Sequence, residues 1–182
     1  MDALLLSLIL CALVEGAGKG ARVYRDLSAG GVRESRLIAG LILACAVNAL
    51  IAALAGYWIA PMLTPEARML FFAAALGFAG GGLFLAPRSG ARAGRAPGFS
   101  RITAAFFVAC FGGSAPLLIA GISVLFADPW MAGIGGGIGC GIGCWAGSSI
   151  SEVVWRRPVS IGLGSVMLLS AFLTTMAGLR LF

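Results

Sequence analysis

Six apolar segments of about 20 residues or more take up most of this 182-residue chain. They cover residues 4–23, 37–62, 67–86, 102–126, 130–150 and 159–181. A helix of about 20 residues crosses the roughly 30 Å of hydrocarbon in a bilayer. Six helices of this length leave little of the chain for a soluble domain, and a composition of 60% hydrophobic and 11% charged residues is typical of a membrane protein. The pattern predicts an all-α integral membrane protein with six transmembrane helices.

An arginine-rich loop over residues 87–101, predicted to be cytoplasmic, divides the six segments into two groups of three. An odd number of spans makes the second half enter the bilayer from the opposite side. Residues 1–86 and 102–182 are therefore predicted to be two inverted three-helix repeats. The tetrapeptide Ile38–Leu41 has a counterpart in Met131–Ile134, 93 positions later, which supports a duplication. Since many secondary transporters share this plan, transport is the first hypothesis.

The distribution of arginine predicts the orientation. Ten arginines lie in the first, third and fifth connections, whereas Arg68 and Arg180 lie on the other side. The ten are Arg22, Arg25, Arg33, Arg36, Arg88, Arg92, Arg95, Arg101, Arg156 and Arg157. Positive loops stay in the cytoplasm, so both termini are expected outside a bacterial inner membrane. The start Met1-Asp2-Ala3 lacks the basic residues of a cleaved signal peptide, so the first segment is expected to be retained.

The composition argues against several classes of function. The chain has no histidine and seven acidic residues, too few for the usual zinc, haem or acid–base constellations, so we expect no enzyme and no cofactor. The net charge of +6 lies in short loops, where membrane orientation explains it without nucleic-acid binding. The expected surroundings are a lipid bilayer.

Two glycine-containing stretches interrupt the first and fourth segments. Residues 15–21 read Glu-Gly-Ala-Gly-Lys-Gly-Ala, and residues 110–116 read Cys-Phe-Gly-Gly-Ser-Ala-Pro. With an offset near 95 they occupy equivalent places in the two halves. Glycine and proline within a span release backbone groups that line a cavity, which predicts a substrate path where the two stretches meet.

The first stretch resembles a motif of the Golgi and thylakoid manganese/calcium transporters and their bacterial relatives. These six-helix proteins bear Glu-x-Gly-Asp-(Lys/Arg)-(Thr/Ser) in each half, and the resemblance covers the whole chain in layout. Glu15 stands at the glutamate and Lys19 at the basic position, whereas Gly18 and Gly20 replace the Asp and the Thr/Ser.

The second stretch keeps less of that motif. Gly112 matches, but Cys110, Gly113 and Ser114 replace the glutamate, the aspartate and the basic residue. The resemblance implies proton-coupled transport of a divalent cation, Mn²⁺ or Ca²⁺, with Glu15 as the metal ligand.

One acid cannot neutralise a dication, so other groups would have to complete the site. Backbone carbonyls, Asn48, Ser114 or a partner subunit are the candidates. The predicted transport path consists of Glu15, Lys19, Asn48, Cys110 and Ser114.

Several positions have two interpretations. Glu15 faces the bundle interior, or it lies hydrated at the end of a short first helix, paired with Lys19. Lys19 is an internal counter-charge or reaches the interface. Cys110, Cys140 and Cys144 bind a soft ion such as Cu⁺, or they are small packing residues. The glycine rows 133/137/141 and 135/139/143 predict close helix contact, and Gly141→Leu is expected to disrupt folding or assembly.

The missing acids leave alternatives to a working cation transporter. One is a non-transporting membrane partner that regulates a motif-intact paralogue, as a homo- or hetero-oligomer. Another is an exporter of small solutes, which a small bundle with broken helices also accommodates.

Overall fold

The structure is a computed structural model that describes residues 1–84, 98–149 and 153–179; for residues 153–157 it describes the backbone alone. These residues form eight α-helices and one 3₁₀ turn, with no strand among them, so the all-α prediction is confirmed. The elements are α1 (Asp2–Ala17), α2 (Lys19–Ala29), α3 (Glu34–Ile59), η1 (Ala60–Met62), α4 (Pro65–Phe84), α5 (Phe99–Phe111), α6 (Ala115–Phe126), α7 (Pro129–Ser149) and α8 (Val153–Gly178).

Three helical stretches of the described chain are long and apolar enough to cross a membrane: Glu34–Met62, Pro65–Phe84 and Pro158–Gly178. Two bent pairs raise this number to five if each pair is one span. These are α1 with α2, bent by 54°, and α5 with α6, bent by 59°. Helix α7 is not among the candidates because its eight glycines contribute little to hydropathy. Of the predicted basic loop, residues 87–97 lie outside the described residues.

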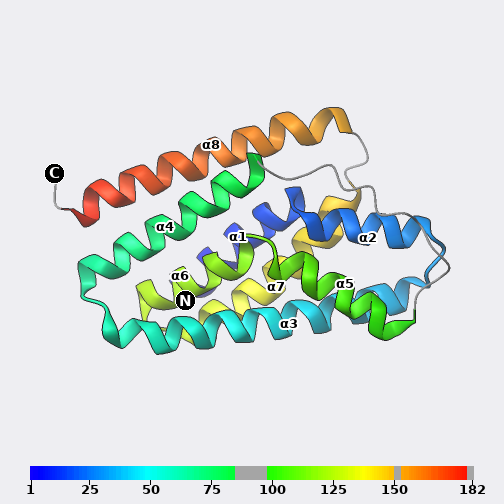
Figure 1. Ribbon diagram of the computed structural model, residues 1–182, viewed down its shortest axis with the longest axis horizontal. Coiled ribbons are helices and arrows are strands. Elements are labelled where there is room, and N and C mark those ends of the chain that lie inside the picture. The colour runs from blue at the N-terminus through cyan, green and yellow to red at the C-terminus, as the bar shows by residue number, and fades with distance from the viewer. Residues whose placement is uncertain (85–97, 150–152, 180–182) are drawn as a thin grey trace.

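The longer helices run along the long axis of the molecule, with α4 and α8 paired along one side (Figure 1). Helices α1 and α7 form the most extensive contact in the described structure. Glycines of α7 make it possible, because a Cβ on Gly135, Gly139, Gly143 or Gly147 would collide with the backbone of α1. The predicted close contact is therefore confirmed for this row of glycines.

The second glycine row faces α3 and is less tightly packed. Added Cβ atoms on Gly133 and Gly137 would lie 3.0 Å from Ala53 Cβ and 3.3 Å from Ala49 Cβ. One on Gly141 would meet nothing within 4 Å. The prediction that Gly141→Leu disrupts folding has no support in the packing of the chain, because this glycine opens onto a surface groove, and the disruption of assembly stays a prediction.

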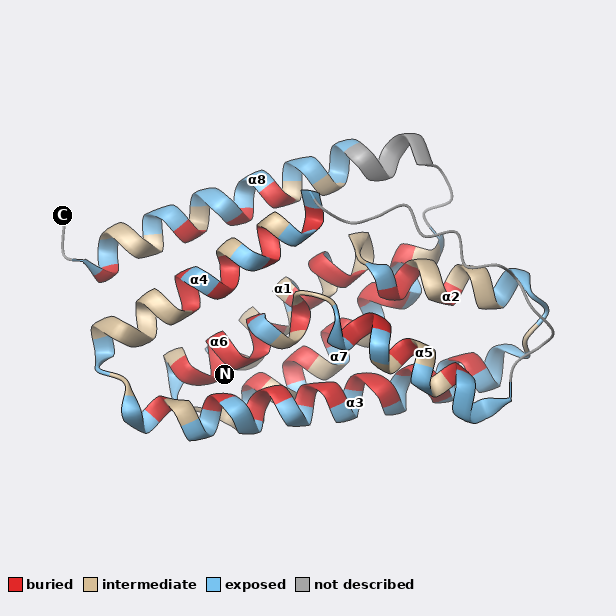
Figure 2. Cartoon of the chain, in the orientation of Figure 1, coloured by how far each residue is buried: buried red, intermediate tan, exposed pale blue. Residues whose placement is uncertain are grey.

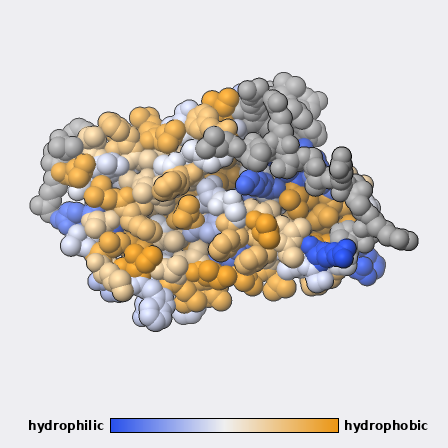
Figure 3. All heavy atoms as spheres, in the orientation of Figure 1, coloured by the Kyte–Doolittle hydropathy of each residue, from blue (hydrophilic) through white to orange (hydrophobic). Residues whose placement is uncertain are grey.

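The outer surface of this bundle is more apolar than that of a soluble protein. Large apolar side chains stay exposed around the outside, among them Trp58 at 70% and Phe78 at 68%, while Glu15 and Asn48 are buried (Figures 2 and 3). An apolar exterior of this kind suits the hydrocarbon of a bilayer. The fold is that of a helical membrane protein.

Candidate functional site

The two interruptions form real helix breaks, as predicted. Helix α1 ends where Gly18 becomes extended, with φ −81° and ψ −169°, and α2 starts at the next residue. Helix α5 is capped by Gly112, and α6 starts with Pro116 in its first turn, where a proline costs no hydrogen bond. The two bent helix pairs pack against each other, with α1 in contact with α6 and α2 in contact with α5.

Glu15 lies in the last turn of α1 and points into the bundle. Glu15 is only 2% exposed to solvent. The interior interpretation is therefore correct and the hydrated one is wrong. The thiol of Cys144, on α7, donates a hydrogen bond to Glu15 Oε2 at 3.7 Å.

Three potential metal ligands converge at this carboxylate. One ligand atom each of Glu15, Cys110 and Cys144 lies within 4.8 Å of the other two, and all three residues are buried. They come from α1, α5 and α7. The expected meeting of Glu15 and Cys110 across the two halves is thus present, and Cys144 joins it.

A fourth thiol adjoins the three ligands. Cys45, on α3, lies near the thiols of Cys110 and Cys144, but its thiol is not among the three ligand atoms that lie within 4.8 Å of one another. Cys140 instead interacts with Cys11. The soft-ion interpretation grouped Cys140 with Cys110 and Cys144, and the structure replaces it with Cys45. We call Glu15, Cys45, Cys110 and Cys144 the thiol–carboxylate cluster.

Glycines of both breaks enclose the carboxylate. A Cβ at Gly113 would lie 2.8 Å from Glu15 Oε1, and one at Gly20 would lie 2.9 Å from Oε2 and collide with Cys144 Sγ. A Cβ at Gly18 would lie 3.2 Å from Oε2. Gly18, Gly20 and Gly113, at which the sequence departs from the transporter motif, therefore make room for Glu15. Sequence reasoning treated these glycines as lost ligands and missed this role.

The other predicted path residues lie around the cluster rather than in it. Lys19 is exposed, and its Nζ donates to the carbonyl of Gly112 at 3.4 Å, so it bridges the two breaks. Asn48 is one turn beyond Cys45 on α3. Its Nδ2 donates to the Phe107 carbonyl at 3.3 Å, and its buried Oδ1 has no hydrogen-bond partner among the described residues. Ser114 is the N-cap of α6 and lies near Gly82 of α4.

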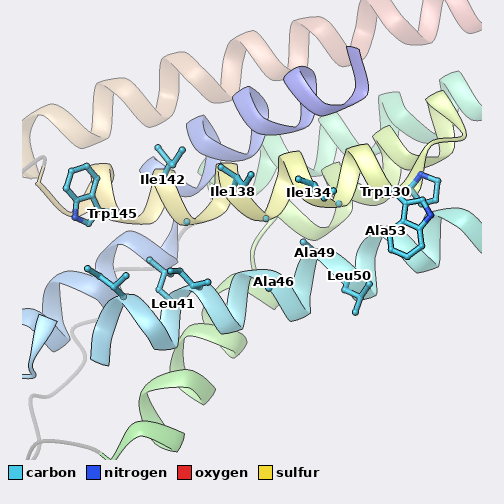
Figure 4. Close-up of a pocket in the computed structure, with 16 residues that line it drawn as sticks. Leu41, Ala46, Ala49, Leu50, Ala53, Trp130, Ile134, Ile138, Ile142 and Trp145 are labelled. Carbon is cyan, nitrogen blue, oxygen red and sulfur yellow. The ribbon is translucent and has the colours of Figure 1, made fainter. Parts of the chain in front are cut away.

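A separate hollow lies on the described surface, away from the cluster. It is a groove of about 820 Å³ between α3 and α7, lined by apolar residues (Figure 4). Ile134, Ile138 and Ile142 line it along α7, with Trp130 and Trp145 toward its two ends. A groove without polar groups offers nothing to bind a cation, and its lining matches lipid chains.

Comparisons with family models, with curated proteins and with solved structures find no match for the chain. Its function is therefore argued from the cluster and from the arrangement of the helices.

Proposed function

We propose that this protein is a cation transporter of six spans arranged as two inverted repeats, with Glu15 as the charged ligand of its path. The observation that carries the proposal is the burial of Glu15 between two helix breaks, beside ligands from the other half. An ionisable group within a membrane bundle is costly to bury and marks ion pathways. Broken helices meeting at such a group are the architecture of secondary transporters.

The cluster itself supports the repeat. Cys110 follows Glu15 by 95 positions, and Cys144 follows Cys45 by 99 positions. The offset that aligns the two breaks therefore pairs Cys45 with Cys140, one helical turn before Cys144 on α7. In this proposal α1–α2, α3 and α4 correspond to α5–α6, α7 and α8. The bends of 54° and 59° agree with the pairing of the broken helices.

The depth of the cluster fits a binding site within the bilayer. Its four members lie 11 to 15 residues from the starts of their helices. At 1.5 Å per residue this corresponds to about 16 to 22 Å, near the middle of a span. In the proposed topology α1 and α7 enter from outside, whereas α3 and α5 enter from the cytoplasm.

Helix α7 completes the six spans in this proposal. It has 21 residues, enough to cross the hydrocarbon, and an exposed isoleucine stripe lies between Trp130 and Trp145. Tryptophans at the two ends of an apolar stripe are typical of the two membrane interfaces. The proposed location is a bacterial inner membrane, with both termini outside and the basic loop inside.

The regulatory-partner alternative is less well supported. That hypothesis arose because three of the four motif acids are missing, so a second chain would have to supply ligands. The cluster brings four potential ligands together within one chain. No partner subunit is required to complete it.

Transport is tested by metal uptake into proteoliposomes that contain the purified protein, with Mn²⁺, Ca²⁺, Zn²⁺ and Cd²⁺ offered separately. We expect Glu15→Gln, which keeps the shape and removes the charge, to lower uptake by about 100-fold. The matched control is Glu34→Gln, which neutralises an exposed acid at the start of α3 and should leave uptake unchanged. Equal uptake by wild type and Glu15→Gln, or no uptake of any of the four ions above empty liposomes, would contradict the proposal.

A further inference from the structure

We infer that the thiol–carboxylate cluster binds a thiophilic d¹⁰ metal ion of the Zn²⁺, Cd²⁺ or Cu⁺ class. The inference rests on the proposed function, because it names the kind of ion that this path carries. It departs from the Mn²⁺ or Ca²⁺ that the motif resemblance implies. The departure follows from the chemistry of the ligands.

The ligand set is sulfur-rich. Ca²⁺ takes six to eight oxygen ligands, and Mn²⁺ also favours carboxylate and carbonyl oxygens. The cluster offers one carboxylate and three thiols, and no second carboxylate joins it among the described residues. Thiolates select Zn²⁺, Cu⁺ and similar soft ions. Cys110, at the place of the second motif's glutamate, changes the ligand from hard to soft.

The spacing suits tetrahedral coordination. Metal–sulfur bonds of about 2.3 Å and metal–oxygen bonds of about 2.1 Å give a sulfur–oxygen edge of roughly 3.6 Å in a tetrahedron. The observed distance from Cys144 Sγ to Glu15 Oε2 is 3.7 Å. The ligand atoms of Glu15, Cys110 and Cys144 lie within 4.8 Å of one another, so small side-chain movements bring all three onto one ion.

The origin of the ligands separates this cluster from ordinary packing cysteines. Its members come from four helices, α1, α3, α5 and α7, and surround a buried carboxylate. A carboxylate in such a place needs a compensating charge. Lys19 is exposed and donates to a backbone carbonyl, so a bound cation would supply most of the charge that balances an ionised Glu15.

Charge balance is satisfied with groups present in the cluster. The Glu15 carboxylate and one thiolate neutralise a dication, and the carboxylate alone neutralises Cu⁺. Each cysteine that binds as a thiolate releases one proton. Loading with Zn²⁺ or Cd²⁺ through one thiolate therefore expels one thiol proton, together with the carboxyl proton wherever Glu15 is protonated in the empty site.

The test is a Cd²⁺ titration of the purified, reduced protein in detergent, followed by ultraviolet thiolate-to-Cd²⁺ charge-transfer absorption. We expect one Cd²⁺ per chain, displaced by Zn²⁺ and retained in excess Mn²⁺ or Ca²⁺. Cys110→Ser and Cys144→Ser should each weaken binding by about 10- to 100-fold. The matched control is Cys140→Ser. Cys140 is a buried free cysteine outside the cluster, and its thiol lies beside that of Cys11, so this variant should bind Cd²⁺ as wild type does.

The absence of a charge-transfer band in wild type would overturn the inference. Displacement of Cd²⁺ by equimolar Mn²⁺ would also overturn it. If a serine variant loses its monodisperse profile, X-ray absorption of Cd²⁺-loaded wild type decides instead. Sulfur ligands together with oxygen support the site, and an all-oxygen shell overturns it. Mn²⁺ uptake by liposomes without Cd²⁺ binding would overturn the soft-ion site and leave transport standing. Cd²⁺ binding without uptake of any ion would overturn transport and leave the site standing.

Discussion

The break between α1 and α2 bends the chain by 54°, and the break between α5 and α6 bends it by 59°. In each, the candidate ligand lies two or three residues before the glycine at which the helix ends, Glu15 before Gly18 and Cys110 before Gly112. The first break supplies a carboxylate and the second a thiol. Similar helix breaks therefore lie next to a hard candidate ligand in one half and a soft candidate ligand in the other.

The helices behind the two breaks also differ. Glycines of α7 let the backbone of α1 approach closely, along the row that begins at Gly135 and ends at Gly147. Helix α5 meets α3 largely through side chains, with Ile102 and Thr103 packed against Gly40. The charged ligand thus lies on the helix held by backbone contact. In the proposed transporter, close backbone packing therefore fixes Glu15 in place, and we expect the residue at position 110 to select the ion.

The largest effect is expected from filling the contact between α1 and α7. Gly139→Leu would drive its side chain into the backbone at Leu8, where neither helix can yield without moving away. We expect a loss of about 3 kcal/mol or more in stability. The folded, monodisperse fraction after purification measures it. Gly141→Leu, facing the open groove, is the control and should purify normally. Equal yields of the two variants would contradict the packing described here.

Making the two breaks chemically alike should change the selectivity. In Cys110→Asp both halves supply a carboxylate, so the ratio of Mn²⁺ to Cd²⁺ uptake is expected to rise by about tenfold or more. Proteoliposome uptake measures the ratio. Ser35→Asp places the same charge on the exposed first turn of α3 and should not raise the ratio. A ratio unchanged in Cys110→Asp, in protein that remains monodisperse, would show that position 110 does not select the ion.

A methyl group at Gly20 tests the space around the carboxylate. In Gly20→Ala the new Cβ would collide with Cys144 Sγ and crowd Glu15 Oε2, which pushes the two ligands apart. We expect Cd²⁺ affinity to fall by about tenfold while the fold persists. Gly81→Ala, with nothing within 4 Å of its new Cβ, is the matched control. Affinity unchanged at position 20 would mean that the cluster is looser than described.

The smallest effect is expected at Lys19. Its exposed ammonium group lies beside the proposed cation site, where it would oppose cation binding through solvent-screened repulsion. Lys19→Met should therefore tighten Cd²⁺ binding by about two- to threefold, whereas Lys19→Arg should not. Weaker binding in Lys19→Met would instead show that the bond to the Gly112 carbonyl holds the two breaks in register.

Much of the fold could be predicted from the sequence, because apolar length and helix-ending residues are local properties. Five of the six expected segments begin within about three residues of their helices, allowing for the predicted breaks. The exception is α8, which begins at Val153 rather than at 159, since Pro158 removes one hydrogen bond near the start of a long helix without ending it. The inverted repeat and the sixth span stay predictions.

The cluster could be predicted only in part. The meeting of Glu15 and Cys110 followed from the offset between the two breaks. The choice of Cys45 over Cys140 depends on how α3 and α7 rotate and cross, which is a property of tertiary packing rather than of spacing. Asn48 and Ser114 were chosen as oxygen donors for a hard cation, and the structure brings sulfur to the carboxylate instead.

The most direct measurement is an anomalous difference map from crystals of the protein grown with Cd²⁺. If one buried site built from both halves of the chain holds the cation, the map should contain a single strong peak bounded by Glu15, Cys110 and Cys144. A strong peak at any other place in the protein, with none at these three side chains, would contradict it.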